Sequence, residues 1–417
     1  MKRILSILFS AMLILSGCSA DKSPAEPSAA PTPKPEKSSY SVPDPMPTPV
    51  YTFEQTPTTD QLRKTAIAGM RDLLSIQWHT ATEIAYTKTG PMSQKQFKHL
   101  PNNVYAGTLY SNASTGIFQF LEFYDLETGE LSYPGEAHQL KEEVGNSCAD
   151  SLLWGWSTVC NSISGGFYPN AMVYANGYLP VGGYTYNFTV DGYNKYPTYK
   201  IVQENGVDAI LNAYTQVLPA DALVSSTANH AMMVIGPARV YYNEDGSIDT
   251  AMSYIPIQDQ RAGSGEGFYE VVEDGYLIQY SGRTSFDFTF ADLIEKHYIP
   301  VTAAEFLGTD PYEKATASIT NGNCKSIEDM QRSKISSNYP LAVARVVVTD
   351  KSGNETVIGR TLFSGAPLTG VPYSYSLSAM NCLKEFSTNE LNVSGNRITL
   401  EVIVSTGDCF TLVDFTL

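Results

Sequence analysis

The stretch "GNSCADSLLWGW" places Cys148 directly after a Gly-Asn-Ser turn and directly before an apolar run with helical spacing. A cysteine attacks an amide only as the thiolate, and the free N–H groups and dipole at a helix N-terminus lower the pKa of a thiol held there. The same N–H groups can stabilise the oxyanion that the attack produces. The stretch therefore predicts a nucleophile on the first turn of a helix.

A thiol nucleophile needs a base, and the chain has five histidines. His230 opens the strand-like run "HAMMVIG" just after a helix and a loop, so its ring could point at the cysteine-bearing helix. The others stand at a helix end, in loops or in the segment "KHYIP": His79, His99, His138 and His297. A single histidine is more often structural, but its pairing with Cys148 makes His230 the candidate base.

Three segments have the spacing of helices. Residues 59–80 carry apolar residues at three- and four-residue steps, which predicts a helix capped by Thr59 or Asp60. Residues 148–159 and 208–218 show the same spacing. The tryptophans of the middle segment, Trp154 and Trp156, are expected in the core or in the wall of a groove.

After the third predicted helix the period changes to that of strands. Short β-type runs separated by Gly, Asn and Asp lie at 230–236, 238–243, 251–260, 267–274 and 276–282. The segment "YNEDGSID" between two of them predicts a hairpin turn. Helices followed by an antiparallel sheet indicate an α+β domain over residues 59–308.

From residue 309 to residue 417 helical spacing nearly vanishes. Apolar and polar residues alternate in four runs, at 341–350, 355–363, 397–407 and 410–417. This pattern predicts a small all-β sandwich appended to the first domain.

The chain opens with "MKRILSILFSAMLILSGCSA", a basic start followed by an apolar stretch and small residues. The apolar stretch is too short to cross roughly 30 Å of hydrocarbon, which predicts a secretory signal over residues 1–18. Its end is similar to a bacterial lipobox, whose cysteine is lipidated, so Cys18 is the candidate anchor; an ordinary cleavage site is the alternative. Residues 19–58, rich in Pro, Ser, Thr and Ala, are expected to form an extended linker.

The cysteine count bears on the state of Cys148. The six cysteines are Cys18, Cys148, Cys160, Cys324, Cys382 and Cys409. If Cys18 carries lipid, five remain, so at least one cannot pair within the chain. The last three could share one disulfide. The sequence leaves three states possible for Cys148: a disulfide with Cys160, a buried inert thiol, or a reactive thiol.

The formal net charge of −16 argues against nucleic acid and against anionic polymers as partners. The sequence shows no paired-histidine motif, no Cys-x-x-Cys, no calcium-loop spacing and no glycine-rich phosphate loop before a helix. We therefore expect neither a metal nor a cofactor, and we expect a monomer.

The order of "GTLYSN", "GNSCADSLLWGW", "VLPADALV" and "NHAMMVIG" resembles the cell-wall cysteine peptidases of the NlpC type and the related CHAP amidases, over roughly residues 100 to 265. The resemblance implies a papain-like fold, with Tyr110 as the upstream tyrosine, Cys148 as nucleophile and His230 as base, while Pro219 and Asp221 match a turn. A loop-packing role for Tyr110 is the alternative. The chain departs from the family motif at five positions: Ser147 for an acid, Ala149 and Asp150 for Ser-Gly, and Ala220 and Asn229 for glycines.

The resemblance also implies a third polar residue that orients the imidazole, on a strand after that of the histidine. The strand "YIPIQDQ" corresponds, and Asp259 fits best, because strand faces alternate and Gln258 would point the other way. Gln258, Gln260 and Ser253 are rivals, and a solvated acid at a strand end is the alternative for Asp259.

Together these expectations predict a cysteine hydrolase that is exported and lipid-anchored at the outer face of the bacterial cytoplasmic membrane. Its substrate would be an amide bond in a stem or cross-link peptide of peptidoglycan. The tyrosine-rich insert at residues 177–200 could form a groove over the site or be a surface loop. An inactive relative, used as a binding or adhesion module, is the alternative function.

Overall fold

The structure of the chain is a computed structural model that describes residues 48–87, 96–101, 103–110, 114–132, 145–163, 178–185, 197–260, 269–271, 277–279, 282–320, 322, 324–363 and 373–417. These residues belong to one structural unit, Tyr40–Leu417. The predicted signal, the candidate anchor Cys18, His138 and residues 177 and 186–196 of the tyrosine-rich insert lie outside the described residues. No helix in the described ranges combines the length and the apolar character needed to cross a membrane.

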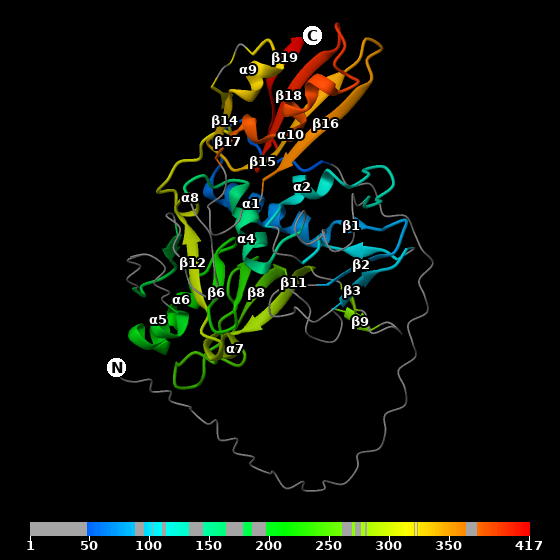
Figure 1. Cartoon of the computed structure of the whole chain (residues 1–417). Helices are drawn as coiled ribbons and strands as arrows, with labels where there is room; N and C mark the ends of the chain where they lie inside the picture. The colour runs from blue at the N-terminus through cyan, green and yellow to red at the C-terminus, as the bar shows by residue number, and fades with distance from the viewer. Residues whose placement is uncertain are drawn as a thin grey trace, which may run out of the picture. The chain divides into compact units, whose positions relative to one another are not determined.

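A six-stranded antiparallel sheet organises the part of the chain before residue 309 (Figure 1). In spatial order its strands are β11 (Gly282–Thr289), β8 (Tyr254–Gln260), β7 (His230–Val234), β6 (Ala222–Ser225), β12 (Ile299–Ala303) and β5 (Tyr178–Pro180). Together with the helices below, this agrees with the predicted α+β class.

Two helices, α1 (Thr59–Ser75) and α4 (Cys148–Ser157), pack against each other and against this sheet. They approach closely at Gly155, where an added Cβ would lie 2.8 Å from the backbone oxygen of Ala66. All ten residues of α4 are buried. A helix buried on every side must be apolar all round, which is why its sequence is nearly free of charge.

The helix α1 begins where its capping residues allow. Thr58, rather than the expected Thr59 or Asp60, is the N-cap, and its side chain and that of Gln61 complete a capping box. The helix ends at Ser75 and not near residue 80, because the chain then becomes extended and β1 (Gln77–Trp78) pairs with β4 (Tyr105–Ala106).

The remaining elements of this part are short. The helices are α2 (Ile117–Leu121), α5 (Thr198–Asn205), α6 (Val207–Tyr214), α7 (Phe290–Glu295) and α8 (Ala304–Leu307). A second, four-stranded sheet contains β2 (Ile84–Thr87), β3 (Gln96–His99), β10 (Leu277–Gln279) and β9 (Tyr269–Val271).

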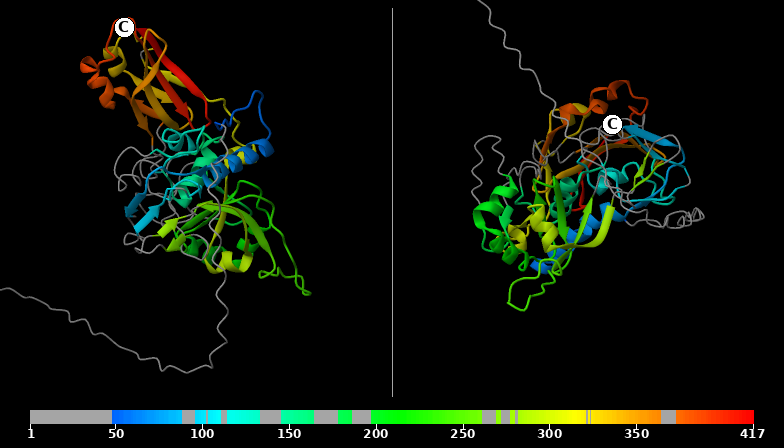
Figure 2. Two further views of the ribbon diagram at one scale, coloured as in Figure 1. Left: turned by 90° about the vertical axis from the view of Figure 1, so that its right-hand side faces the viewer. Right: turned by 90° about the horizontal axis from the view of Figure 1, so that it is seen from below.

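From residue 309 on, two further antiparallel sheets share one apolar core. One contains β13 (Ala317–Ile319), β14 (Lys334–Ser337) and β17 (Ser374–Ser376), and the other contains β16 (Glu355–Leu362), β15 (Leu341–Thr349), β18 (Arg397–Val404) and β19 (Cys409–Thr416). Figure 2 shows the four strands of the second sheet side by side, in orange to red. The sequence missed the short helices of this part: α9 (Ile327–Gln331), α10 (Asn381–Lys384), η2 (Leu377–Ala379) and η3 (Phe386–Thr388).

The C-terminal sheets contact the end of α4 directly. The Ser405 hydroxyl donates to the carbonyl of Ser157 at 2.5 Å, and the Tyr339 hydroxyl is shared between the carbonyls of Glu313 at 2.9 Å and Val159 at 3.3 Å. The carbonyls of Ser157 and Val159 belong to the last turn of the helix and the residues after it, which have no partner within the helix itself. The C-terminal part therefore completes the hydrogen bonding of α4.

Residues 238–243 do not form the predicted strand. Arg239 and Tyr242 make isolated bridges to Tyr254 and Ile248, and the segment folds into a turn in which the N–H of Asn243 donates to the carbonyl of Ser247. The predicted hairpin turn is therefore present. Its flanks do not continue a ladder: Tyr241 and Tyr242 are exposed, and Ala238 and Val240 are only partly buried against the core.

The turn before β6 holds a residue in the left-handed region. Ala220 has φ +71°, is fully buried, and its backbone is fixed at both ends: its N–H donates to Val234 and its carbonyl accepts from Trp156 Nε1 at 2.7 Å. An L-residue pays about 1–2 kcal/mol for this conformation, and glycine does not.

We therefore expect Ala220→Gly to leave the free energy of unfolding unchanged or to raise it by up to about 1 kcal/mol, because the relief of strain offsets the added entropy of the unfolded chain. The matched control is Ala213→Gly, at an equally buried alanine inside α6. This variant should have a free energy of unfolding lower by about 1 kcal/mol or more. Urea denaturation of both variants measures the difference. Equal losses would contradict a strained turn at residue 220.

Candidate active site

Cys148 is the first residue of α4, and a capping box fixes that end of the helix. Ser147 is the N-cap, with extended backbone, and its Oγ accepts from the N–H of Asp150 at 3.4 Å. Asp150 Oδ2 in turn accepts from the N–H and the hydroxyl of Ser147, at 3.2 and 2.5 Å. Cys148 is thus fixed on the first turn of the helix, whose N–H groups have no partner within the helix.

The segment before α4 brings a tyrosine to the thiol. Asn146 is fully buried, its N–H donates to the carbonyl of Leu109, and its Oδ1 accepts from the Thr108 hydroxyl at 3.1 Å. Tyr110 pairs with Asn146 in a parallel bridge, and its hydroxyl lies 4.0 Å from Cys148 Sγ. Burial and the charge of Cys148 raise the pKa of Tyr110 well above its usual value, so the phenol remains a proton donor.

His230 opens β7, the strand against which α4 packs. Its Nε2 lies 2.6 Å from Asp259 Oδ2, which leaves Nδ1 as the ring nitrogen for the bond that its side chain makes with the Cys148 thiol. The side chain of His230 is 14 % exposed, while that of Asp259 is completely buried. Cys148, His230 and Asp259 therefore form one connected chain of side chains.

The electrostatics of this chain favour a charged pair. Burial raises the pKa of the Cys148 thiol, but the charge and hydrogen bond of His230 outweigh it and bring that pKa below its usual value. Burial lowers the pKa of His230, but the charge of Cys148 and the bond to Asp259 raise it to about 9. The geometry thus supports a thiolate beside an imidazolium at neutral pH.

An arginine that the sequence did not single out completes the chain. Arg283 stands directly opposite Asp259 in the β11–β8 ladder, and its Nε and Nη2 donate to the two carboxylate oxygens at 2.7 and 2.6 Å. Its guanidinium also stacks over the ring of Phe286, 3.3 Å from the centroid. Burial alone would raise the pKa of Asp259, yet the hydrogen bonds from His230 and Arg283 hold it below its usual value.

The rivals of Asp259 are engaged elsewhere. Gln258 Nε2 donates to the carbonyl of Ile67 in α1 at 3.0 Å, and Gln260 Nε2 donates to the carbonyl of Thr108 at 2.8 Å. The Ser253 hydroxyl bonds the backbone of Tyr241. Asp259 is fully buried and contacts His230, so it is not a solvated acid at a strand end.

The other described histidines serve packing or loops. His99 is buried against the rings of Trp78 and Tyr105. His79 Nε2 lies 3.1 Å from the carbonyl of Thr128, and His297 Nδ1 lies 3.1 Å from Thr227 Oγ1. None of these three histidines lies beside Cys148.

The cysteines do not form the disulfides left open by the sequence. Cys148 and Cys160 are both free and buried, and Cys382 and Cys409 are free as well, so the three downstream cysteines share no bond. Cys160 differs from Cys148 in its surroundings: burial and the neighbouring Glu305 raise its pKa well above the usual value. Only one of the two central thiols therefore has a lowered pKa.

Four of the five departures from the family motif have a structural role here. Ser147 is a good N-cap, as an acid at that position would be, and Asp150 is its capping-box partner. Ala220 and Asn229, where the motif has glycine, have φ values of +71° and +50°, in the left-handed region that glycine favours. The backbone keeps the glycine conformation although the residue differs.

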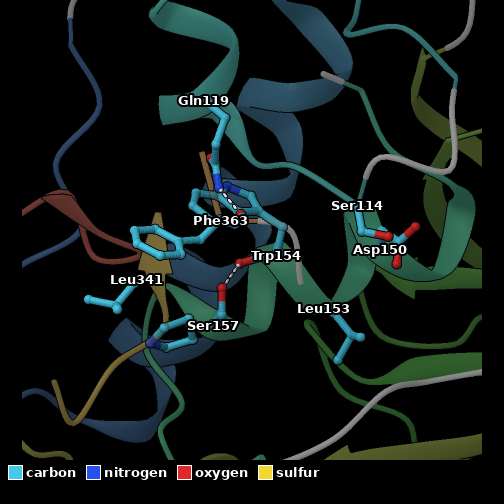
Figure 3. A pocket seen from close by; sticks show the side chains of 9 residues that line it. Ser114, Gln119, Asp150, Leu153, Trp154, Ser157, Leu341 and Phe363 are labelled. Carbon is cyan, nitrogen blue, oxygen red and sulfur yellow. Dashed lines mark hydrogen bonds between the residues drawn. The ribbon is translucent and has the colours of Figure 1, made fainter. Parts of the chain in front are cut away.

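A small cavity of about 30 Å³ lies behind α4, and Figure 3 shows the side chains that line it. Asp150 and Ser114 stand together at one end, and Trp154 separates them from Phe363 and Leu341 of the C-terminal part. Gln119 Nε2 donates to the carbonyl of Phe363 at 2.8 Å. Trp154 is 8 % exposed and belongs to the core, so it is not a ligand platform.

A larger pocket of about 420 Å³ opens beside the imidazole. Its described lining residues are Tyr110, Thr227, Ala228, Asn229, His230, Met232, Arg283, Phe288, Lys296 and Tyr298. This volume falls within the range of small-molecule and peptide side-chain sites. Within the described residues no group of three or more His, Cys, Asp or Glu side chains is arranged to hold a metal ion.

The Arg283–Asp259 ion pair can be compared with a second Arg–Asp pair of the same geometry on the surface. Arg397 and Asp414 make the same two-point contact, at 2.8 and 2.7 Å, but their side chains are 54 and 48 % exposed, against 20 and 0 % for Arg283 and Asp259. Removing one partner of a buried pair leaves an uncompensated charge, whereas water solvates the survivor of an exposed pair.

We therefore expect Arg283→Met to lower the free energy of unfolding by about 3 kcal/mol, and Arg397→Met to change it little. Chemical denaturation of the two single variants measures this. The double variant Arg283→Met with Asp259→Asn should regain part of the loss, because the buried charge is then gone. Equal effects of the two arginine variants would show that burial of Asp259 is not what makes the contact matter.

The thiol chemistry gives a second prediction. His230→Ala removes the cation that lowers the Cys148 pKa, while burial, which raises that pKa, remains. At pH 7 iodoacetamide should therefore label Cys148 about ten-fold or more slowly in the variant, and the gap should narrow at alkaline pH, where the thiol of the variant also ionises. Cys160 should label slowly in both proteins. Mass spectrometry of the two cysteine peptides measures the labelling rates of Cys148 and Cys160. Equally slow labelling of both cysteines in the wild type would refute a reactive Cys148.

Comparison of the chain with protein-family models, with curated proteins and with solved structures found no match in any of the three. The function therefore has to be inferred from the chemistry of the residues described above. Their arrangement is a buried thiol on a helix N-terminus, joined through an imidazole to a carboxylate held by a guanidinium.

Proposed function

We propose that the protein is a cysteine hydrolase that cleaves amide bonds, with Cys148 as nucleophile, His230 as general acid and base, and Asp259 as the residue that orients the imidazole. One observation carries the proposal: His230 contacts both of the other residues. It bonds the Cys148 thiol and lowers the pKa of that thiol, and its Nε2 lies 2.6 Å from Asp259 Oδ2. A nucleophile, its base and an orienting acid in this order is the arrangement that acyl transfer requires.

In the first step the thiolate of Cys148 attacks the amide carbonyl, and the C=O bond opens to an oxyanion. The N–H groups of the first turn of α4 and the protonated hydroxyl of Tyr110 are positioned to donate to that oxygen. The imidazolium of His230 then gives its proton to the leaving nitrogen, and the C–N bond breaks to give an amine and a thioester.

In the second step neutral His230 takes a proton from water, and the hydroxide that forms attacks the thioester. The carbonyl is restored, the C–S bond breaks, and a carboxylic acid leaves while the thiolate–imidazolium pair is regenerated. Asp259 stays ionised throughout, because Arg283 and His230 both donate to it. Its task is to hold the ring with Nδ1 toward the sulfur.

We place this chemistry in a papain-like domain of the NlpC or CHAP type, on the basis of the motif order and of a helix-borne cysteine packed against a strand-borne histidine. The left-handed backbone at residues 220 and 229, where the motif has glycines, supports the same assignment. The lipobox-like "LSGC" supports export and anchoring through Cys18, and the substrate that fits such a location is the peptide part of peptidoglycan.

The test is hydrolysis of purified peptidoglycan and of synthetic stem peptides, with the released fragments identified by mass spectrometry. Cys148→Ala should abolish release, and His230→Ala should lower the rate by about 10²–10⁴-fold, the usual contribution of a general acid–base group. Cys409→Ala, at an exposed thiol far along the chain, is the matched control and should keep full activity. Release that survives Cys148→Ala would reject the proposed nucleophile.

A further inference from the structure

A buried threonine lies where three elements of the candidate site meet. Thr108 stands two residues before Tyr110, is 1 % exposed, and takes part in no step of the proposed reaction. Its N–H donates to the carbonyl of Leu73, in the last turn of α1, at 2.8 Å. Its hydroxyl and its carbonyl each bond a further element, so Thr108 anchors the segment that carries Tyr110.

The hydroxyl of Thr108 bonds the segment that leads into the nucleophile. It donates at 3.1 Å to Oδ1 of Asn146, which precedes Cys148 by two residues. Asn146 is fully buried, and its Nδ2 has no hydrogen-bond partner among the described residues. Without the Thr108 hydroxyl the whole side-chain amide would be buried and unpaired, which is costly. The bond therefore favours one relative position of the two segments.

The carbonyl of Thr108 bonds the strand of the orienting acid. It accepts a hydrogen bond from Nε2 of the fully buried Gln260 at 2.8 Å. Gln260 follows Asp259 in β8, and side chains of successive residues in a strand lie on opposite faces. Asp259 bonds His230 on one face, while Gln260 bonds Thr108 on the other. The strand β8 is thus tied both to the imidazole and to the tyrosine segment.

The contact between Tyr110 and Cys148 is sensitive to these ties. The Tyr110 hydroxyl lies 4.0 Å from Cys148 Sγ, which is long even for a sulfur acceptor, so a displacement of a fraction of an ångström would break the contact. The backbone of Tyr110 pairs with Asn146, the residue whose side chain Thr108 holds. A change in the Thr108–Asn146 bond would therefore reach the distance between the phenol and the thiol.

We propose that Thr108 is a positioning residue of the hydrolase: it holds the segments of Tyr110, Cys148 and Asp259 together, and it acts through the distance from the Tyr110 hydroxyl to the thiol. The inference rests on the proposed function for the reaction itself. The coupling between Thr108 and the thiol can be measured without a substrate, because the rate of Cys148 alkylation reports the ionisation of that thiol.

The test follows alkylation of Cys148 by iodoacetamide against pH in the full-length protein. Burial raises the pKa of the Cys148 thiol, and the hydrogen bond from Tyr110 is one of the contacts that lower it. Thr108→Val replaces the hydroxyl by a methyl group and should raise the midpoint of the rate–pH profile by about half a pH unit or more. Thr108→Ser, which keeps the hydroxyl, should restore the wild-type midpoint.

A double-mutant cycle with Tyr110→Phe shows whether Thr108 acts through Tyr110. Tyr110→Phe alone should raise the midpoint, and Thr108→Val added to it should raise it little further. Burial keeps the pKa of Tyr110 well above its usual value, so the phenol stays protonated during the titration. An equal shift from Thr108→Val with and without the Tyr110 hydroxyl, or no shift at all, would overturn the proposal.

Thr158→Val is the matched control, at a threonine that is also fully buried. Its hydroxyl donates to the carbonyl of Gly155 at 2.7 Å, at the end of α4 away from Cys148. This variant should leave the midpoint unchanged; a shift as large as that of Thr108→Val would overturn the proposal, since loss of any buried hydroxyl would then explain the result. If Thr108→Val does not fold by circular dichroism, Asn146→Leu removes the same bond from its other end. An unchanged midpoint in Asn146→Leu would also overturn the proposal.

Hydrolysis of synthetic stem peptides separates the inference from the proposed function. Thr108→Val should lower kcat by about ten-fold with little change in KM, because a donor to the oxyanion acts in the transition state. If the wild type cleaves the peptides and Thr108→Val keeps both the wild-type kcat and the wild-type midpoint, the inference fails while the hydrolase stands. If neither peptides nor peptidoglycan are cleaved but the alkylation cycle responds as expected, the hydrolase fails and the positioning of Tyr110 by Thr108 stands.

Discussion

The complete burial of α4 is the constraint on which the rest of the structure depends. A helix without an exposed face needs a partner on every side and at both ends, since no water satisfies its first N–H groups or its last carbonyls. At the N-terminal end Ser147 and Asp150 supply part of this through their capping box, directly beside Cys148. Burial by itself raises the pKa of the Cys148 thiol, so its lowered pKa depends on the groups that the same packing brings to the helix: His230, the backbone of Ala231 and Tyr110.

The histidine and its partners meet this helix through the sheet. Residue 230 begins β7, residue 259 lies near the end of β8 and residue 283 near the start of β11, so three adjacent strands each supply one member of the chain of side chains. The positions are set by ladder register and not by loops. A site on paired strands keeps its distances better than one on loops, which suits a proton relay that depends on tenths of an ångström.

The sequence predicted those parts of the site that depend on local pattern. The spacing after Cys148 indicated a helix, and alternation along "YIPIQDQ" separated Asp259 from Gln258. Arg283 could not be found in this way, because its position opposite Asp259 depends on the register of two strands separated by more than twenty residues. The failed strand at 238–243 shows the opposite error, a β-like pattern in which Tyr241 and Tyr242 are exposed and do not pack in the core.

The hydrogen bonds from Ser405 and Tyr339 to the end of α4 have a consequence for how this architecture can vary. An appended module that only touches its neighbour through side chains can be exchanged, lost or duplicated. Here the C-terminal part provides donors for backbone carbonyls at the end of the helix that begins with Cys148, and a substitution that removed a donor without changing the packing would leave those carbonyls buried and unpaired. A change in the C-terminal sheets can therefore reach α4 through the backbone of the helix itself, so each part limits how the other can vary.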